Sequence, residues 1–217
     1  MRQAGGSVSG AATPGSGWAR RFDCWSPCYD ASQLQRVLYG PAHEAVLRHA
    51  CQRVPQPGRI LDVGCGTGRL AVRLEAAFGG TLVVGVDLST GMIRHAATRA
   101  GTGAAFVAGC AERLPFAGAV FGLVVVTLSM AHWWDVAAGL GEIRRVMAPG
   151  AVLVAAETMP ASRPRFGSAA LWWRRPGVRG GLPSLIAASG LRVRRVEPIR
   201  PVAVAHDAVL VAADRPR

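Results

Sequence analysis

Residues 60–70 read Ile-Leu-Asp-Val-Gly-Cys-Gly-Thr-Gly-Arg-Leu, a short apolar run that passes through three alternating glycines into a helical pattern. Leu70, Leu74 and Phe78 continue that pattern, so the order predicts a strand, a tight turn and a helix. Glycine adopts positive φ without strain and leaves room for a ligand. The free N–H groups at the start of the helix favour negative charge there. The stretch therefore predicts a ligand-binding turn at the end of a strand.

The spacing of the glycines separates two classes of binding turn. A dinucleotide site needs Gly-x-Gly-x-x-Gly, which from Gly64 would put the last glycine at position 69. That position is Arg69, and the third glycine is Gly68, one residue early. The pattern instead resembles motif I, acidic-x-Gly-x-Gly-x-Gly, of the class I S-adenosylmethionine-dependent methyltransferases.

Three stretches further along the chain resemble motifs of the same family. Asp87 follows an expected strand at 81–86, where the family's acidic residue accepts hydrogen bonds from ribose hydroxyls. Residues 109–116 resemble the element Gly-Asp-Ala-x-x-Leu-Pro-Phe, and residues 142–150 resemble Glu-x-x-Arg-Val-Leu-x-Pro-Gly. Together these motifs make the resemblance specific.

The resemblance implies a doubly wound, Rossmann-like α/β fold, with a mostly parallel seven-stranded sheet and helices on both faces. It implies S-adenosyl-L-methionine as cofactor and methyl transfer to an O, N or C centre of a small-molecule or lipid-like acceptor. No metal site is expected. The positions that match the family's cofactor residues are Asp62, Gly64, Cys65, Gly66, Gly68, Asp87, Leu88, Met92, Cys110, Ala111, Glu112 and Thr127.

The chain departs from the family at Cys110, where an aspartate usually accepts from the adenine amino group. A thiol is a poor acceptor, so adenine recognition would pass to the Ala111 N–H or to Glu112. Glu112 can equally be a solvated residue at a helix start. The weakened element leaves open a second function, a protein that binds the cofactor without transferring a methyl group.

His132 is the candidate catalytic residue. A sulfonium donor is already activated, so the protein must mainly align the reactants and exclude water. A base is needed only when the nucleophile arrives protonated, and histidine can take a proton near neutral pH. His132 follows the expected fourth strand, beside Trp133 and Trp134. The alternative is that His132 only shapes the pocket.

Length and composition indicate one domain, because 217 residues that are 50% hydrophobic can bury one core. Aromatic residues between Trp18 and Tyr39 either lie over the cofactor or only pack helices onto the sheet. The expected parts are a disordered tail at 1–17, a helical cap at 18–57, a cofactor-binding core at 59–158, an arginine-rich insertion at 159–181, and a final helix and strands at 182–214.

All 25 basic residues are arginines, and the formal net charge is +12. Because lysine is absent, a compositional bias explains the charge better than a nucleic-acid-binding patch. The Asn-Pro-Pro-Tyr element of amino-methylating DNA enzymes is also missing after the fourth strand, although a nucleic-acid-modifying enzyme stays an alternative. The insertion is expected either to cover the acceptor entrance and favour an anionic or membrane-associated acceptor, or to be a solvated loop. Its key residues are Arg163, Arg165, Arg174, Arg175 and Arg179, with Trp172 and Trp173.

Five cysteines without a signal peptide favour reduced thiols and a cytoplasmic location. The longest apolar run, 116–130, is too short and too glycine-interrupted to span a bilayer. Cys24, Cys28, His49 and Cys51 have spacings that suit a zinc site poorly, so idle or buried thiols are expected.

Overall fold

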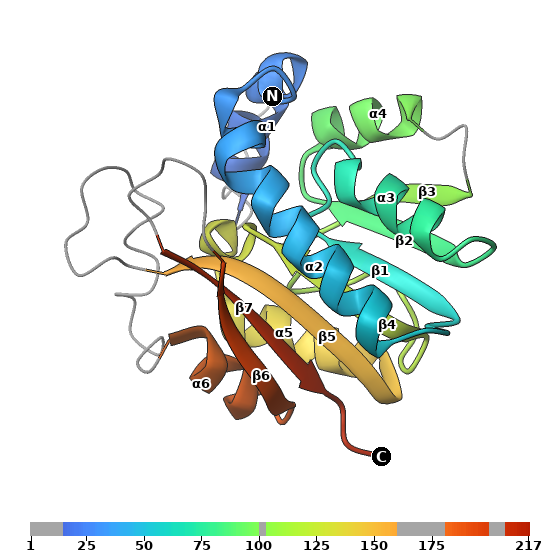
Figure 1. Cartoon of the computed structure of the whole chain (residues 1–217). Helices are drawn as coiled ribbons and strands as arrows, with labels where there is room; N and C mark the ends of the chain where they lie inside the picture. The colour runs from blue at the N-terminus through green and yellow to red at the C-terminus, as the bar shows by residue number, and fades with distance from the viewer. Residues whose placement is uncertain (1–14, 100–102, 160–180, 200–206) are drawn as a thin grey trace, which may run out of the picture.

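The computed structural model describes residues 15–99, 103–159, 181–199 and 207–217. Its centre is a seven-stranded sheet with the strand order β3-β2-β1-β4-β5-β7-β6 (Figure 1). Strands β1 to β5 are parallel, and β7 is antiparallel to both β5 and β6. The strands are β1 (Arg59–Val63), β2 (Leu82–Asp87), β3 (Ala104–Ala108), β4 (Phe121–Thr127), β5 (Met147–Met159), β6 (Arg192–Ile199) and β7 (Asp207–Asp214). The predicted fold class is confirmed.

Helices cover both faces of the sheet (Figure 1). The apolar sides of α2 and α3 belong to one core cluster, and those of α5 and α6 to the other. The helices are α1 (Ser16–Tyr29), α2 (Gly40–Arg53), α3 (Arg69–Ala77), α4 (Thr90–Thr98), α5 (Val136–Val146) and α6 (Gly181–Ala188), with a π-helical turn η1 (Gln35–Tyr39) and a 3₁₀ turn η2 (Met130–His132).

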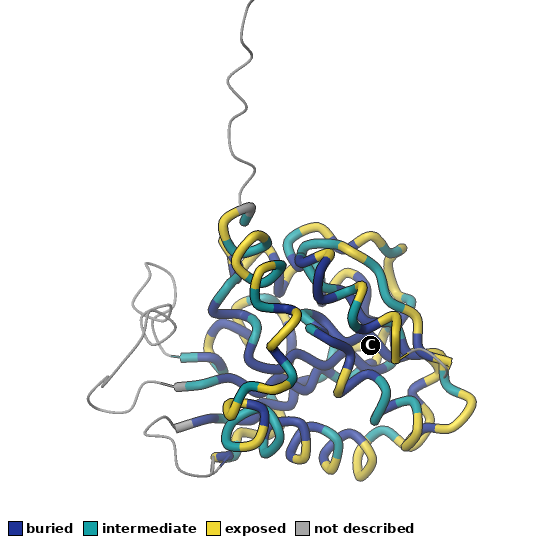
Figure 2. The backbone as a smooth tube through the Cα atoms, turned by 90° about the horizontal axis from the view of Figure 1, so that it is seen from above, coloured by how far each residue is buried: buried dark blue, intermediate teal, exposed yellow. Residues whose placement is uncertain are grey.

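The central strand β4 is buried on both faces, as expected of a parallel strand between two helical layers. Phe121 is 2% exposed, and the run 123–126 is fully buried. In Figure 2 the central strands are dark blue and the outer turns of the helices are yellow. The strand order reverses between β1 and β4, and ligands of open α/β sheets bind at such a point, at the carboxyl ends of the strands.

The junction between α5 and β5 differs from the sequence expectation. The Pro149-Gly150 pair predicts a helix that stops there and a strand that begins at Ala151, but α5 ends at Val146 and β5 begins at Met147. The carbonyls of Arg145 and Val146 accept from the N–H groups of Ala119 and Val120. These bonds to a neighbouring segment take up two helix-end carbonyls, so the chain passes directly from helix to strand. The expected boundary was wrong for that reason.

The N-terminal cap begins with α1 at Ser16, two residues before the expected boundary at 18. Residues 1–14 lie outside the described part of the chain, as does nearly all of the arginine-rich insertion (160–180) with its two tryptophans. Among the described residues, no helix has the length and hydropathy that crossing a membrane requires.

Candidate active site

The glycine turn between β1 and α3 has the predicted conformation. Gly64, Gly66 and Gly68 have φ of +75°, +54° and +77°, which other residues rarely adopt. A Cβ at Gly64 would lie 2.4 Å from the Ser129 Cβ, and one at Gly68 would lie 2.7 Å from the Phe106 ring. The turn therefore needs glycine for close packing as well as for its dihedral angles.

Asp87 connects the glycine turn to the turn after β2 by hydrogen bonds. Its Oδ2 accepts from the Gly66 N–H at 2.9 Å, and its Oδ1 accepts from the Ser89 N–H at 2.9 Å. Burial raises the pKa of Asp87, while the two N–H donors lower it in part. Carboxylate oxygens accept more than one hydrogen bond, so Asp87 retains acceptor capacity toward a ligand.

An aromatic chamber lies at the carboxyl ends of β1, β2 and β4. Its floor comes from the strand-end loops, and its roof comes from α1 and η1. It contains seven predicted site residues: Gly64, Gly66, Asp87, Leu88, Met92, Thr127 and His132. The rest of the lining is Trp18, Phe22, Tyr29, Tyr39, Leu128, Ser129 and Trp133. The N-terminal aromatics therefore line the site and do more than pack helices.

A second space, the Asp62 cavity, adjoins the chamber, because Tyr29, Tyr39, Gly64, Gly66 and Thr127 line both. Its own lining residues are Gln35, His43, Asp62, Cys65, Thr67, Arg69 and Leu70. The sequence predicts thirteen candidate site residues, and seven of them line the chamber. Asp62 and Cys65 line the Asp62 cavity alone. The other four, Gly68, Cys110, Ala111 and Glu112, line neither space.

Three buried polar atoms on the wall of the Asp62 cavity have no hydrogen-bond partner among the residues that the structure describes: Asp62 Oδ2, Thr127 Oγ1 and Gln35 Nε2. Such atoms are uncommon in folded proteins, because each costs about 1–3 kcal/mol of lost hydration. A carboxylate and a hydroxyl can accept from an ammonium group, and an amide N–H₂ can donate to a carboxylate. The three atoms therefore fit the zwitterionic amino-acid end of S-adenosyl-L-methionine.

Asp62 is 2% exposed, at the end of β1. Burial, and secondarily the charge of Asp87, raise the pKa of Asp62 to about 7. At neutral pH its carboxyl group is therefore divided between the neutral and the ionised form. A cation placed beside it would favour the ionised form.

The segment after β3 holds the loop that follows β4. Residues 110–116 form turns, with a short bridge between Cys110 and Arg113. Glu112 Oε1 accepts from the N–H groups of Trp134 at 2.9 Å and Asp135 at 3.3 Å. The interpretation of Glu112 as a solvated helix start was wrong, since its carboxylate holds the loop after β4.

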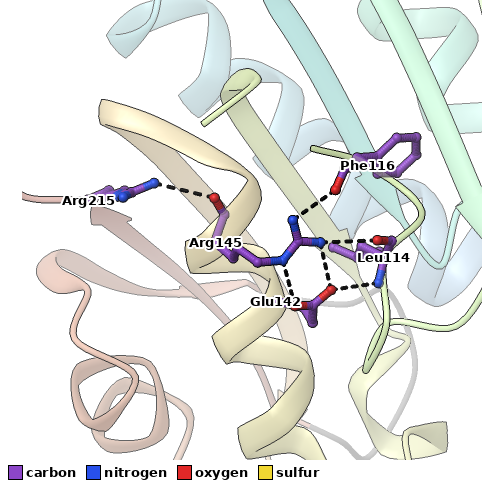
Figure 3. Close-up of polar contacts among 5 residues, drawn as sticks. All are labelled: Leu114, Phe116, Glu142, Arg145 and Arg215. Carbon is purple, nitrogen blue, oxygen red and sulfur yellow. Dashed lines mark hydrogen bonds and ion pairs between the residues drawn. The ribbon is translucent and has the colours of Figure 1, made fainter. Parts of the chain in front are cut away.

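Figure 3 shows hydrogen bonds that join the segment 109–116 to the segment 142–150. The Arg145 guanidinium donates to both Glu142 oxygens at 2.7 and 2.8 Å and to the carbonyls of Phe116 at 2.8 Å and Leu114 at 3.1 Å. Glu142 also accepts from the Leu114 N–H at 2.8 Å. The Glu-x-x-Arg pair thus clamps the loop that the sequence assigned to adenine.

His132 lies at the end of η2, with its ring against α1. Its centroid is 4.4 Å from that of Trp18 and 4.9 Å from that of Phe22. Trp133 is buried and lines the chamber, but Trp134 is 41% exposed. Trp133 therefore belongs to the chamber wall beside His132, whereas Trp134 lies at the surface and does not close the chamber to water.

Two aspartates dock α1 over the site. Asp23 Oδ1 accepts from the Ser89 hydroxyl at 2.6 Å and the Gly91 N–H at 2.7 Å, and the Ser89 bond is the main cause of its lowered pKa. Asp30 accepts from the Thr67 hydroxyl at 2.7 Å and forms an ion pair with Arg99. These contacts hold the aromatic face of α1 against the chamber.

The sequence reasoning missed two buried polar residues, Gln35 and Glu157. Glu157 follows the apolar run 151–156, which is the same strand-end signal that identified Asp62 and Asp87. Gln35 carries no such signal. Within the described ranges, no three His, Cys, Asp or Glu residues group as metal ligands, and the five cysteines are free thiols.

Comparison with known proteins gives a consistent result. A family model described as "Methyltransferase domain" matches residues 60–150. A demethylmenaquinone methyltransferase from Corynebacterium kroppenstedtii is 35% identical over 141 residues, which cover 64% of this chain and 58% of that protein. The chain thus matches less than two thirds of that relative's length.

Two solved structures share the fold. The [4+2]-cyclase SpnF superposes with a TM-score of 0.75 at 18% identity, over 94% of this chain and 98% of that one. An S-adenosylmethionine-dependent methyltransferase from Aquifex aeolicus superposes with a TM-score of 0.69 at 17% identity, over 89% and 98%. The glycine turn lies inside the region that matches the methyltransferase domain, residues 60–150, and the fold as a whole is one that a methyltransferase structure shares.

Proposed function

We propose that this chain binds S-adenosyl-L-methionine across the aromatic chamber and the Asp62 cavity and transfers its methyl group to an apolar small-molecule or lipid-like acceptor. The observation that carries the proposal is that Asp62 Oδ2, Thr127 Oγ1 and Gln35 Nε2, beside the glycine turn, find no hydrogen-bond partner within the described ranges. Asp62 and Thr127 would accept from the cofactor's ammonium group, and Gln35 would donate to its carboxylate. Binding would pair all three buried atoms.

The chamber lining would meet the ribose and the faces of adenine, whereas the polar edge of adenine would extend past it toward residues 110–112, which line neither space. Asp87 would accept from the ribose hydroxyls, and Leu88 and Met92 would flank adenine. Cys110 would meet the adenine amino group poorly, because a thiol is a weak acceptor. Glu112 is engaged by the Trp134 and Asp135 N–H groups. The Ala111 N–H is therefore the better candidate for a polar contact with adenine.

The acceptor side is aromatic. Trp18, Phe22, His132 and Trp133 form one wall of the chamber, and such a wall suits a flat, apolar acceptor. The relative named as a demethylmenaquinone methyltransferase supports an acceptor of that kind. When bound, the cofactor supplies an electrophilic methyl group. The residues of this chain align the acceptor and exclude water, and His132 takes the proton where the nucleophile is a hydroxyl.

Calorimetry of the purified protein with S-adenosyl-L-methionine tests the first half of the proposal, with NADH as the competing ligand. The second half is tested by S-adenosylhomocysteine formation, first with demethylmenaquinone in detergent as probe and then with pooled metabolites. We expect cofactor binding and product formation. Tight binding of NADH with no binding of S-adenosyl-L-methionine would overturn the proposal.

A second candidate is a cofactor-binding protein that does not transfer the methyl group. Two observations favour this second function: the thiol at Cys110, and the fold that the chain shares with a protein described as a [4+2]-cyclase. Fold alone does not set the reaction. Cofactor binding without S-adenosylhomocysteine formation against any acceptor tested would favour this candidate.

The free thiols support a reducing, cytoplasmic compartment for either function.

A further inference from the structure

Glu157 is a buried acid that the proposed function has not yet used. It lies near the carboxyl end of β5 and is 1% exposed. Its Oε1 accepts two hydrogen bonds, from the Ser129 N–H at 2.8 Å and the Met130 N–H at 2.9 Å. Its Oε2 is buried, and no group in the described part of the chain forms a hydrogen bond with it. Burial raises the pKa of Glu157 to about 7, and the two N–H donors oppose that rise.

The turn that Glu157 holds begins with an unfavourable backbone conformation. Leu128 has φ +52°, in the left-handed region that residues with a branched side chain seldom occupy. Its N–H donates to the Ala156 carbonyl at 2.8 Å, and the Ser129 hydroxyl donates to the Val63 carbonyl at 3.2 Å. These bonds and those of Glu157 hold Leu128 in this conformation.

The same turn carries the acceptor wall. The Ser129 carbonyl accepts from the His132 N–H at 3.0 Å, and the Met130 carbonyl accepts from the Trp133 N–H at 3.2 Å. The peptide group between Ser129 and Met130 thus donates to Glu157 through its N–H and accepts from His132 through its carbonyl. The Met130 carbonyl, which accepts from Trp133, belongs to the next peptide group along the turn. Without Glu157, two N–H groups at this turn would lose their acceptor, and the turn would shift to hydrate them.

We propose that Glu157 is a positioning residue for methyl transfer, which fixes the turn 129–132 so that His132 and Trp133 form the acceptor wall. This inference rests on the proposed function. This role requires a side chain at position 157 that is long enough for one oxygen to accept from two adjacent N–H groups. Glu157→Gln keeps that reach with an amide oxygen. Glu157→Asp keeps the carboxyl group but withdraws it by one methylene.

The experiment compares these two variants with the matched control Glu197→Asp, which changes a partly exposed glutamate on β6 that pairs with Arg195. Amide hydrogen exchange at Ser129, Met130, His132 and Trp133 measures the turn without cofactor or acceptor. We expect Glu157→Asp to accelerate this exchange by about 10-fold or more. We expect Glu157→Gln and the control to remain within about threefold of the unmodified protein.

Steady-state kinetics of the same variants then test whether the turn 129–132 affects methyl transfer. For an acceptor found by the product assay, Glu157→Asp should lower kcat/KM by about 10-fold, with the dissociation constant of S-adenosyl-L-methionine within about threefold. Glu157→Gln should retain both the exchange protection and the turnover of the unmodified protein. Unchanged exchange in Glu157→Asp, or a Glu157→Gln protein as impaired as Glu157→Asp, overturns the inference. An unmodified protein that forms no S-adenosylhomocysteine refutes the proposed function, while the exchange data still decide whether Glu157 holds the turn.

Discussion

Asp87 Oδ2 accepts a hydrogen bond from the Gly66 N–H at 2.9 Å, which joins the acid after β2 to the middle of the glycine turn after β1. The two residues are 21 positions apart, and adjacent parallel strands bring them together. The bond fixes the turn before any ligand arrives. Preorganisation of this kind lowers the cost of binding.

The first prediction concerns Asp87. We expect Asp87→Ala to weaken S-adenosyl-L-methionine binding by about 1–3 kcal/mol, because the ribose hydroxyls would lose their acceptor and the Gly66 N–H its partner. Isothermal calorimetry measures the change. Asp87→Asn, which keeps one acceptor oxygen, should lose less. Equal affinities in all three proteins would contradict a ribose-binding role.

The second prediction concerns pH. The pKa of Asp62 is raised to about 7 in the folded protein, so the Asp62 carboxyl group of the ligand-free protein is mostly protonated below that pH. Binding the cofactor's ammonium group favours the ionised form, and cofactor affinity should therefore rise between about pH 5 and pH 7, by at most tenfold per pH unit. Calorimetry across this range measures the slope. Asp62→Asn should bind more weakly with a flatter slope, and an unaltered slope would contradict the assignment.

The same raised pKa has a consequence for stability. Between the unfolded value of 3.8 and about 7, the folded state holds more protons on Asp62 than the unfolded state does. The contribution of Asp62 to the free energy of unfolding therefore falls as pH rises through this window. Urea denaturation should show this loss in the unmodified protein and a smaller one in Asp62→Asn.

The third prediction concerns Cys110. If the thiol meets the adenine amino group poorly, Cys110→Asp should tighten cofactor binding by about 1 kcal/mol, since a carboxylate is the stronger acceptor. Cys110→Ser is the matched control, with similar size and no charge. Calorimetry that finds the aspartate variant no tighter would show that another group, such as the Ala111 N–H, already serves.

The fourth prediction concerns His132. With a hydroxyl acceptor, His132→Ala should lower kcat by about 10²–10⁴-fold and flatten the acidic limb of the pH profile, with cofactor affinity unchanged. Steady-state kinetics across pH measure both effects, and His95→Ala on α4 is the control. A rise in acceptor KM alone, with the pH profile preserved, would leave His132 as a wall residue that packs on Trp18 and Phe22.

Features that depend on short spacing could be predicted from the sequence. The three glycines of the turn, the acid at the end of β2 and the apolar run of β4 each occupy a few consecutive positions. Their conformation follows from backbone freedom and hydrophobic periodicity, which act locally. The parallel sheet follows in turn, because such strands need covering on both faces.

Features that depend on distant partners were decided only by the tertiary structure. The end of α5 was misplaced because its last carbonyls bond to residues 119 and 120, and Glu112 was misread because its partners are Trp134 and Asp135. Gln35, Asp62 and Thr127 come from a π-helical turn and two strands, and only the fold puts their unpartnered atoms on one cavity wall. Glu157 meets Ser129 and Met130 for the same reason. Hydrogen bonds between distant segments depend on how the sheet brings its strand-end loops together, and a pattern over a few consecutive residues does not contain that arrangement.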